Sequence, residues 1–176
     1  MSNSVRLART SDVDDIAAVQ ARSWRQAYAS ILPTSVLDSL DPAEMAFEWG
    51  RALLSGEQHR VFVAVAEGTG AIVGAASVGP CGDPDLEGAA VGEIGALFVD
   101  PDHQRAGHGS RLMHAAVDLL RGTGIDECVT WVALDDEARR AFFTSAGWGP
   151  DSAYRDLQIP DAPDALREVR LVTALG

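Results

Sequence analysis

Within one short glycine-containing segment, the pattern of apolar residues changes from that of a strand to that of a helix. This change constrains the fold more than any other feature. Residues Glu93–Val99 are mostly apolar and predict a strand. From Gly109 to Arg121, apolar residues recur at helical spacing and predict an amphipathic helix. Because strands and helices also alternate further along the chain, we expect a mixed α/β sheet covered by helices.

The remaining segments show patterns of the same two kinds. Alternating or continuous apolar runs indicate strands, helical spacing indicates helices, and glycine or proline separates them. We expect one domain over residues 1–176, with strands at Val5–Arg9, Val61–Val65, Ala71–Val78, Cys128–Leu134, Trp148–Asp156 and Glu168–Leu175, and helices from Val13 to Ala27, in one or two pieces from Pro33 to Leu54, and from Asp135 to Ala146. The glycine-, proline- and acid-containing segment Gly79–Gly92 predicts a surface loop or the edge of a cleft.

Composition excludes several classes of function. The net charge is −12, from 26 acidic and 14 basic residues, which opposes nucleic-acid binding. It suits a cationic substrate, or it serves solubility alone. No apolar run approaches the ~20 residues of a membrane helix, and Met1–Arg6 does not begin a signal peptide. Cys81 and Cys128 lack metal-ligand spacing, so we expect a cytoplasmic protein with free thiols, no metal and no membrane contact.

The turn between the strand and the helix favours an anionic ligand. A helix N-terminus presents unpaired N–H groups with a partial positive charge, and glycine lets a ligand approach the main chain. Gly107 and Gly109 therefore fit a pyrophosphate, to which Arg105 adds a charge, although a glycine turn without a ligand has the same spacing. The Gly-Lys-Ser/Thr of a P-loop is absent, and Leu112 stands where the dinucleotide motif requires glycine.

A family resemblance rests on three segments in one order. Gln104-x-x-Gly107-x-Gly109, directly after Leu97–Pro101, resembles the acetyl-CoA signature of the GNAT N-acetyltransferase superfamily. Residues 141–148, Ala-Phe-Phe-Thr-Ser-Ala-Gly-Trp, and the start of the chain through Ser23–Tyr28 are similar to flanking segments of the family. The resemblance implies a mostly antiparallel sheet that is splayed in the middle. It also implies transfer of an acetyl group from acetyl-CoA to a small-molecule or peptide amine, and a possible homodimer.

The same resemblance assigns the cofactor contacts. Main-chain groups of the strand end would pair with the pantetheine arm, and those of the turn would hold the pyrophosphate. The expected cofactor-binding residues are Leu97, Phe98, Val99, Gln104, Arg105, Ala106, Gly107, His108, Gly109, Ser110 and Asp136. Asp136 stands where the family often has asparagine, so it either contacts pantetheine or only caps a helix. As loop histidines, His103 and the side chain of His108 are expected in solvent.

The resemblance also suggests acid and base roles. Glu93 is the candidate general base, because the family often places a carboxylate at the start of this strand; a solvent-facing glutamate is the alternative. Phe143 replaces the tyrosine that often protonates the leaving thiolate. Tyr28 or Tyr154 could serve instead, or the thiolate could leave unprotonated.

The acceptor and the extent of catalysis stay open in the sequence. Trp24, Tyr28 and Trp49 could wall an acceptor pocket, although their helical spacing favours a core role. The rival hypotheses are a module that binds acyl-CoA with little catalysis, and an acyltransferase that uses another acyl group or an alcohol acceptor.

Overall fold

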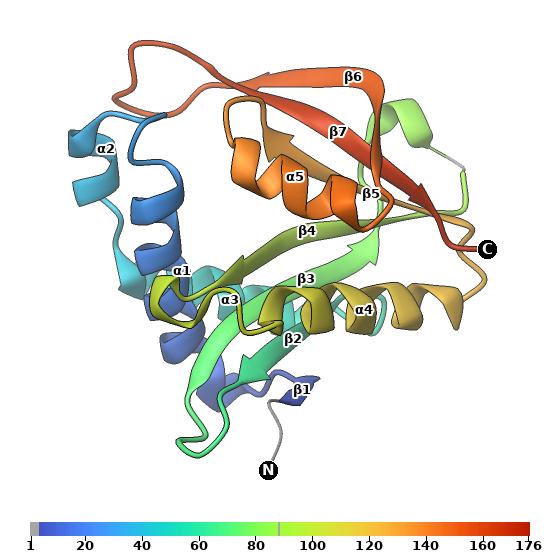
Figure 1. Ribbon diagram of the computed structural model, residues 1–176, viewed down its shortest axis with the longest axis horizontal. Coiled ribbons are helices and arrows are strands. Elements are labelled where there is room, and N and C mark those ends of the chain that lie inside the picture. The colour runs from blue at the N-terminus through green and yellow to red at the C-terminus, as the bar shows by residue number, and fades with distance from the viewer. Residues whose placement is uncertain (1–3, 88) are drawn as a thin grey trace.

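The computed structural model describes residues 4–87 and 89–176 and shows one twisted sheet covered on both faces by helices (Figure 1). Residues 1–3, part of the segment behind the expectation of no signal peptide, and residue 88 of the expected loop lie outside the described residues. The strands are β1 (Ser4–Leu7), β2 (Arg60–Val65), β3 (Ile72–Pro80), β4 (Val91–Val99), β5 (Glu127–Ala133), β6 (Gly149–Leu157) and β7 (Leu166–Ala174). The helices are α1 (Val13–Ala27), α2 (Thr34–Asp38), α3 (Pro42–Leu54), α4 (His108–Arg121) and α5 (Glu137–Ser145).

The sheet order is β1-β2-β3-β4-β5-β7-β6, and every neighbouring pair is antiparallel except β4 with β5. That parallel contact is short: Val91–Glu93 pair with Glu127–Val129, and the pairing stops there. Beyond Glu93 the two strands separate, as Figure 1 shows. The structure thus confirms the mixed, mostly antiparallel fold and its splayed middle.

Two apolar clusters hold the helices on the sheet. Leu112, Ala116 and Leu120 of α4 pack with Ile94 and Leu97 on one face. On the opposite face, α1 and α3 pack through Ile16, Ala17 and Trp49 against Val63, Ala75 and Phe98. Burial on this scale supplies the main driving force for folding. The β4 strand therefore runs between two packed layers, and its main chain is exposed only where β5 leaves it.

Several predicted boundaries were wrong. The loop expected over Gly79–Gly92 is shorter, because β3 continues to Pro80 and β4 begins at Val91. Gly92 lies within β4. The branched end of Leu120 occupies the space that a side chain at position 92 would fill, 2.6 Å from an added Cβ, so glycine there lets α4 pack closely on the strand. The α4 helix begins at His108, one residue before the predicted start.

Candidate functional site

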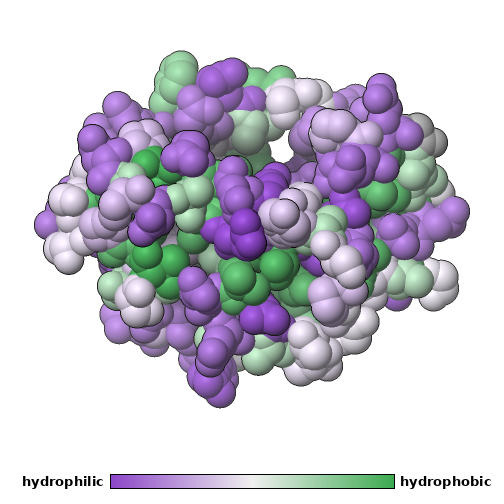
Figure 2. Space-filling view, turned by 90° about the horizontal axis from the view of Figure 1, so that it is seen from above, coloured by the Kyte–Doolittle hydropathy of each residue, from purple (hydrophilic) through white to green (hydrophobic). Residues whose placement is uncertain are grey.

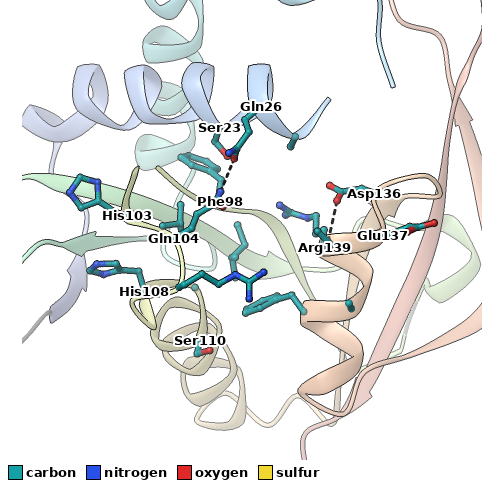
Figure 3. Close-up of a pocket in the computed structure, with 18 of the residues that line it drawn as sticks. Ser23, Gln26, Phe98, His103, Gln104, His108, Ser110, Asp136, Glu137 and Arg139 are labelled. Carbon is teal, nitrogen blue, oxygen red and sulfur yellow. Dashed lines mark hydrogen bonds between the residues drawn. The ribbon is translucent and has the colours of Figure 1, made fainter. Parts of the chain in front are cut away.

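A cleft of about 980 Å³ opens where β4 and β5 separate. Its walls come from the end of α1, the end of β4, the turn before α4 and the start of α5 (Figure 3). Figure 2 looks down on the molecule from above and shows a hollow surrounded mainly by hydrophilic side chains. The cleft is long and open, which suits an extended ligand with a charged end.

The turn from Gln104 to Gly107 is shaped for contact with its main chain. Gly107 precedes α4 with φ of 78°, in the left-handed region that glycine adopts without penalty. Arg105 shares this conformation with φ of 62°. The Arg111 guanidinium donates to the Ala106 carbonyl oxygen at 3.0 Å and braces the turn from the helix side.

The first turn of α4 leaves N–H groups available for a ligand. The Arg111 N–H donates to the Gly107 carbonyl oxygen at 3.1 Å, and within the described chain no hydrogen bond is donated by the N–H groups of residues 108–110. Such groups carry the positive end of the helix dipole. A side chain at position 109 would meet the Phe142 ring at 3.4 Å, so glycine keeps this entrance narrow but open. This geometry fits a phosphate-bearing ligand.

Two contacts between α1 and this region fix the position of the turn. The Gln104 side chain donates to that of Gln26 at 2.9 Å (Figure 3). The Arg22 guanidinium donates to the buried Asp100 carboxylate through Nε at 2.9 Å and also through Nη2. Burial opposes ionisation of Asp100, but hydrogen bonds from Arg22 and the Asp102 N–H outweigh it, so the pKa of Asp100 lies below its ordinary value. Position 22 gave no signal in the sequence, because the contact spans 78 residues.

The cleft brings together most of the residues proposed from the sequence. Those in its lining are Leu97, Phe98, Val99, Gln104, Arg105, Gly107, His108, Gly109, Ser110 and Asp136. Ala106 lies within the turn but does not line the cleft. Glu93, in β4, does not line the cleft either. Sequence reasoning missed Ser23 and Gln26 of α1, and Arg139 and Phe142 of α5, which complete the walls. Ser23, Gln26 and Phe142 lie in segments that carry the family resemblance, but nothing in the sequence gave these single residues a role. Arg139 lies outside those segments, and helix spacing alone could not identify it.

His108 corrects one expectation. Its side chain is buried, with 2% exposed, and its Nδ1 is buried without a hydrogen-bond partner in the described part of the protein. Burial, followed by the charges of Arg111 and His103, lowers the pKa of His108. The residue opens α4 and packs beneath the turn, whereas a glycine-flanked histidine in the sequence suggested solvent. His103, in contrast, is exposed.

At the far wall, Asp136 accepts a hydrogen bond from the Arg139 N–H at 3.1 Å (Figure 3). It therefore caps α5, and it lines the cleft as well. Phe143 is fully buried, and its ring lies 5.2 Å from that of Phe142 and 5.1 Å from that of Trp148, measured between centroids. Phe143 thus supports the wall from behind.

Glu93 lies where β4 leaves β5, on the sheet face that α1 and α3 cover. Glu93 is paired with Gly79 of β3. The register shifts between Ser77 and Val78, which leaves Gly95, two residues after Glu93, in a bulge. Glu93 is half-buried. Burial, together with the nearby Glu93 carboxylate, raises the pKa of the Cys81 thiol. The carboxylate therefore stands at the base of the splayed region rather than in the cleft itself.

A second hollow of about 480 Å³ lies between α1 and α3. Trp24 and Trp49 line it, together with the carboxylate-bearing Asp41, Glu44 and Glu48. Trp49 is a core residue as expected, and its indole N–H donates to Gln20 at 2.7 Å. Trp24 is 36% exposed, which corrects the core role proposed for it. The lining has an acidic and aromatic character, which suits a cation with an apolar body.

Neither a membrane-spanning helix nor a metal-binding cluster is found in the residues that the structure describes. No helix there is long and apolar enough to cross a membrane. No group of three or more histidine, cysteine or acidic side chains in residues 4–87 and 89–176 could hold a metal ion.

Comparisons with known proteins point to one family. The model of the acetyltransferase (GNAT) family matches residues 18–148. The uncharacterized N-acetyltransferase YuaI of Bacillus subtilis (strain 168) is 36% identical over 129 residues, which cover 73% of this chain and 70% of that protein.

Solved structures show the same fold at low identity. PaiA N-acetyltransferase from Thermoplasma acidophilum, in complex with coenzyme A, has a TM-score of 0.75 and 19% identity, over 96% of this chain and 98% of that one. YncA from Salmonella typhimurium, with its cofactor acetyl-CoA, has a TM-score of 0.72 and 19% identity, and the match covers 100% of this chain and 95% of that one. The family match, the relative and the fold agree, and we conclude that this chain belongs to the GNAT acetyltransferase family.

Proposed function

We propose that the chain transfers the acetyl group of acetyl-CoA to a primary amine by direct attack, with no covalent enzyme intermediate. The observation that carries this proposal is the cleft, which joins an open edge of β4 to a turn with available N–H groups. An extended pantetheine arm fits beside β4 as an added strand, and the pyrophosphate fits the N-terminus of α4. Structural neighbours that contain coenzyme A or acetyl-CoA support this ligand.

The electrostatics of the chain suit this reaction. An ammonium group must lose a proton before it attacks, and Glu93 is the proposed base. A main-chain N–H in the range Leu97–Val99 would polarise the thioester carbonyl. Burial raises the pKa of Cys128 to about 12 and also raises that of Cys81, so neither thiol is a ready nucleophile at neutral pH. The hollow between α1 and α3, with its three carboxylates, supports a cationic acceptor.

Substitution of Gly107 by Glu tests the cofactor site. The variant places a carboxylate where the phosphates would bind and strains a residue with φ of 78°. We expect CoA affinity, measured by calorimetry, to fall at least about 100-fold, since several charge-assisted hydrogen bonds are lost. Gly124→Glu is the matched control, because Gly124 has φ of 76° and open space around it. Equal CoA affinity in the two folded variants would contradict the assignment.

A mass-spectrometric screen of an amine library with acetyl-CoA tests the reaction itself. Acetylated amine, formed in proportion to enzyme and time, is the expected result. The full burial of Phe143, which has no hydroxyl group, favours one rival: a module that binds acyl-CoA with little catalysis. Tight CoA binding without turnover would support that rival. The remaining alternative is an acyltransferase that uses another acyl group or an alcohol acceptor. Other acyl-CoAs and hydroxyl compounds, run in the same screen, test it.

A further inference from the structure

The proposed reaction releases one proton in each turnover, and the inference below rests on that proposed function. The ammonium acceptor loses two protons while its C–N bond forms and the C–S bond of the thioester breaks. One proton ends on the departing sulfur, and the other must leave the site. Glu93 can accept that proton but must give it up before the next turnover. Only part of Glu93 reaches solvent, so a neighbouring group that carries the proton outward would speed its release.

The strand register places one histidine in line with this carboxylate. Glu93 is paired with Gly79 across β3 and β4. On the other side of β3, Arg60 is paired with Val78, so His59, which immediately precedes β2, continues the register opposite Gly79. Residues directly opposite in antiparallel strands project from the same face of a sheet. His59, Gly79 and Glu93 thus form one row across three strands.

Gly79 leaves space above β3 for the side chain of His59. A Cβ added at Gly79 would lie 2.5 Å from Cδ2 and 3.1 Å from Nε2 of His59, so the imidazole occupies the space that a side chain there would fill. The φ of Gly79 lies outside the left-handed region, and its backbone does not require glycine. The absent side chain instead lets the ring lean over β3 toward Glu93. His59 is also exposed, so the ring reaches solvent.

Other charged and titratable groups lie near this row, among them the Cys128 thiol, which interacts with Glu93, and Asp83, which interacts with Cys81. The Cys81 thiol lies beside Glu93. Next to His59 in the chain, the Arg60 guanidinium donates to the His59 carbonyl oxygen at 3.1 Å. Glu57 lies in the same loop, and the nearby α3 helix carries the pair of Glu48 with Arg51.

We propose that His59 receives the acceptor's proton from Glu93, across one water molecule, and releases it to bulk solvent. Histidine exchanges protons readily near neutral pH, which suits this role. His59 acts through Glu93 and does not touch the reacting atoms. It is therefore a proton-exit group, and its loss should limit turnover only when no other carrier is present.

Two variants remove the imidazole from this position by different means. His59→Gln keeps a side chain of similar reach, and Gly79→Ala displaces the ring because the added Cβ would lie too close to it. We expect kcat in both to fall about tenfold at low buffer concentration and to recover when imidazole buffer is added. CoA affinity and the melting temperature should change little. His114→Gln is the control, because His114 is exposed on α4, against the opposite face of the sheet.

The outcomes separate this inference from the proposed function. Wild-type protein that acetylates no amine overturns the function, and the proton route with it. Active wild-type protein whose kcat at low buffer equals that of His59→Gln overturns the proton route alone. A readout that needs no turnover is the NMR spectrum of the imidazole protons. Glu93→Gln should shift the resonances of His59 and leave those of His114 unchanged, and unshifted His59 resonances would contradict the geometry.

Discussion

Tyr28 caps the end of α1, and its phenol is half-buried near charges from the opposite side of the cleft. Burial raises the pKa of Tyr28; the charge of Arg139 opposes this shift, and those of Glu168 and Asp136 add to it. The phenol therefore stays protonated at neutral pH, although its raised pKa makes it a weaker acid than a free tyrosine. Tyr154, the other tyrosine of the chain, is 61% exposed on β6 beneath the Arg167 guanidinium. Tyr28 lies near Arg139 and Asp136, which line the cleft, so of the two acids suggested by the sequence we propose Tyr28.

Substitution of Tyr28 by Phe tests this preference. We expect kcat to fall about tenfold or more, because the leaving thiolate loses its proton donor. The raised pKa keeps the phenol protonated to higher pH than in a free tyrosine, so the loss should be the same throughout about pH 7–9. Steady-state kinetics across this range provides the measurement, with Tyr154→Phe as the control. Equal kcat values for Tyr28→Phe and wild type would remove Tyr28 from the mechanism.

Among the elements, α1 and the end of β4 depend on each other through the pair of Arg22 and Asp100. The carboxylate is buried, with 5% of the side chain exposed, and the guanidinium is half-exposed. Asp100 also accepts a hydrogen bond from the Asp102 N–H at 3.0 Å, so it shapes the chain just before the turn. One ion pair therefore anchors the helix and orients the turn before α4.

Arg22→Ala should lower the free energy of unfolding by about 1–3 kcal/mol at neutral pH, because a buried carboxylate loses its donor. The lowered pKa of Asp100 means that this stabilisation is present above the pKa of the unfolded chain and is lost as the pH falls through the folded value. Urea unfolding should therefore show the difference from wild type shrinking below about pH 4.

Arg51→Ala is the comparison for this experiment, since Arg51 pairs with Glu48 on the exposed side of α3. An exposed pair contributes about 0–1 kcal/mol. A difference between Arg22→Ala and wild type that stays constant down to acid pH would show that Asp100 is not the partner that matters.

The sequence predicted elements better than contacts between them. Hydrophobic period located β4 and α4 to within two residues, because local burial decides where such elements form. It could not locate Gln26, Arg139 or Arg22, since their roles depend on partners that are distant in the chain. The burial of His108 was also beyond local pattern, as a turn residue is covered only by the tertiary packing around it.

Over the whole molecule, Arg170 on β7 joins the two halves of the sheet. Its guanidinium donates to Asp151 of β6 at 2.8 Å and to Asp83 of the β3–β4 connection at 2.7 Å. Only 8% of its side chain is exposed. Burial lowers the pKa of Arg170, but hydrogen bonds to Asp151 and Asp83 outweigh this effect and raise it. Because β4 and β5 share only three residue pairs, this bridge is an important link between the halves.

Arg170→Met should therefore destabilise the protein by about 3 kcal/mol or more, as it leaves two carboxylates without their partner. Hydrogen exchange should become faster in residues 81–87 and in β6. Arg167→Met, on the same strand, is the control, because its pair with Asp156 is solvent-exposed. Matching exchange rates in the two variants would show that the bridge does not tie the connection to β7.

The gap between β4 and β5 leaves part of a strand edge unpaired inside the sheet. An unpaired strand edge usually invites pairing with another chain. Here that edge is recessed within the sheet, in the cleft between α1 and α5. One of the two outer edges, β6, carries Pro150 and the charged residues Asp151, Arg155 and Asp156, which discourage strand addition. The fold thus keeps a main-chain edge open inside the sheet, where the end of β4 lines the cleft.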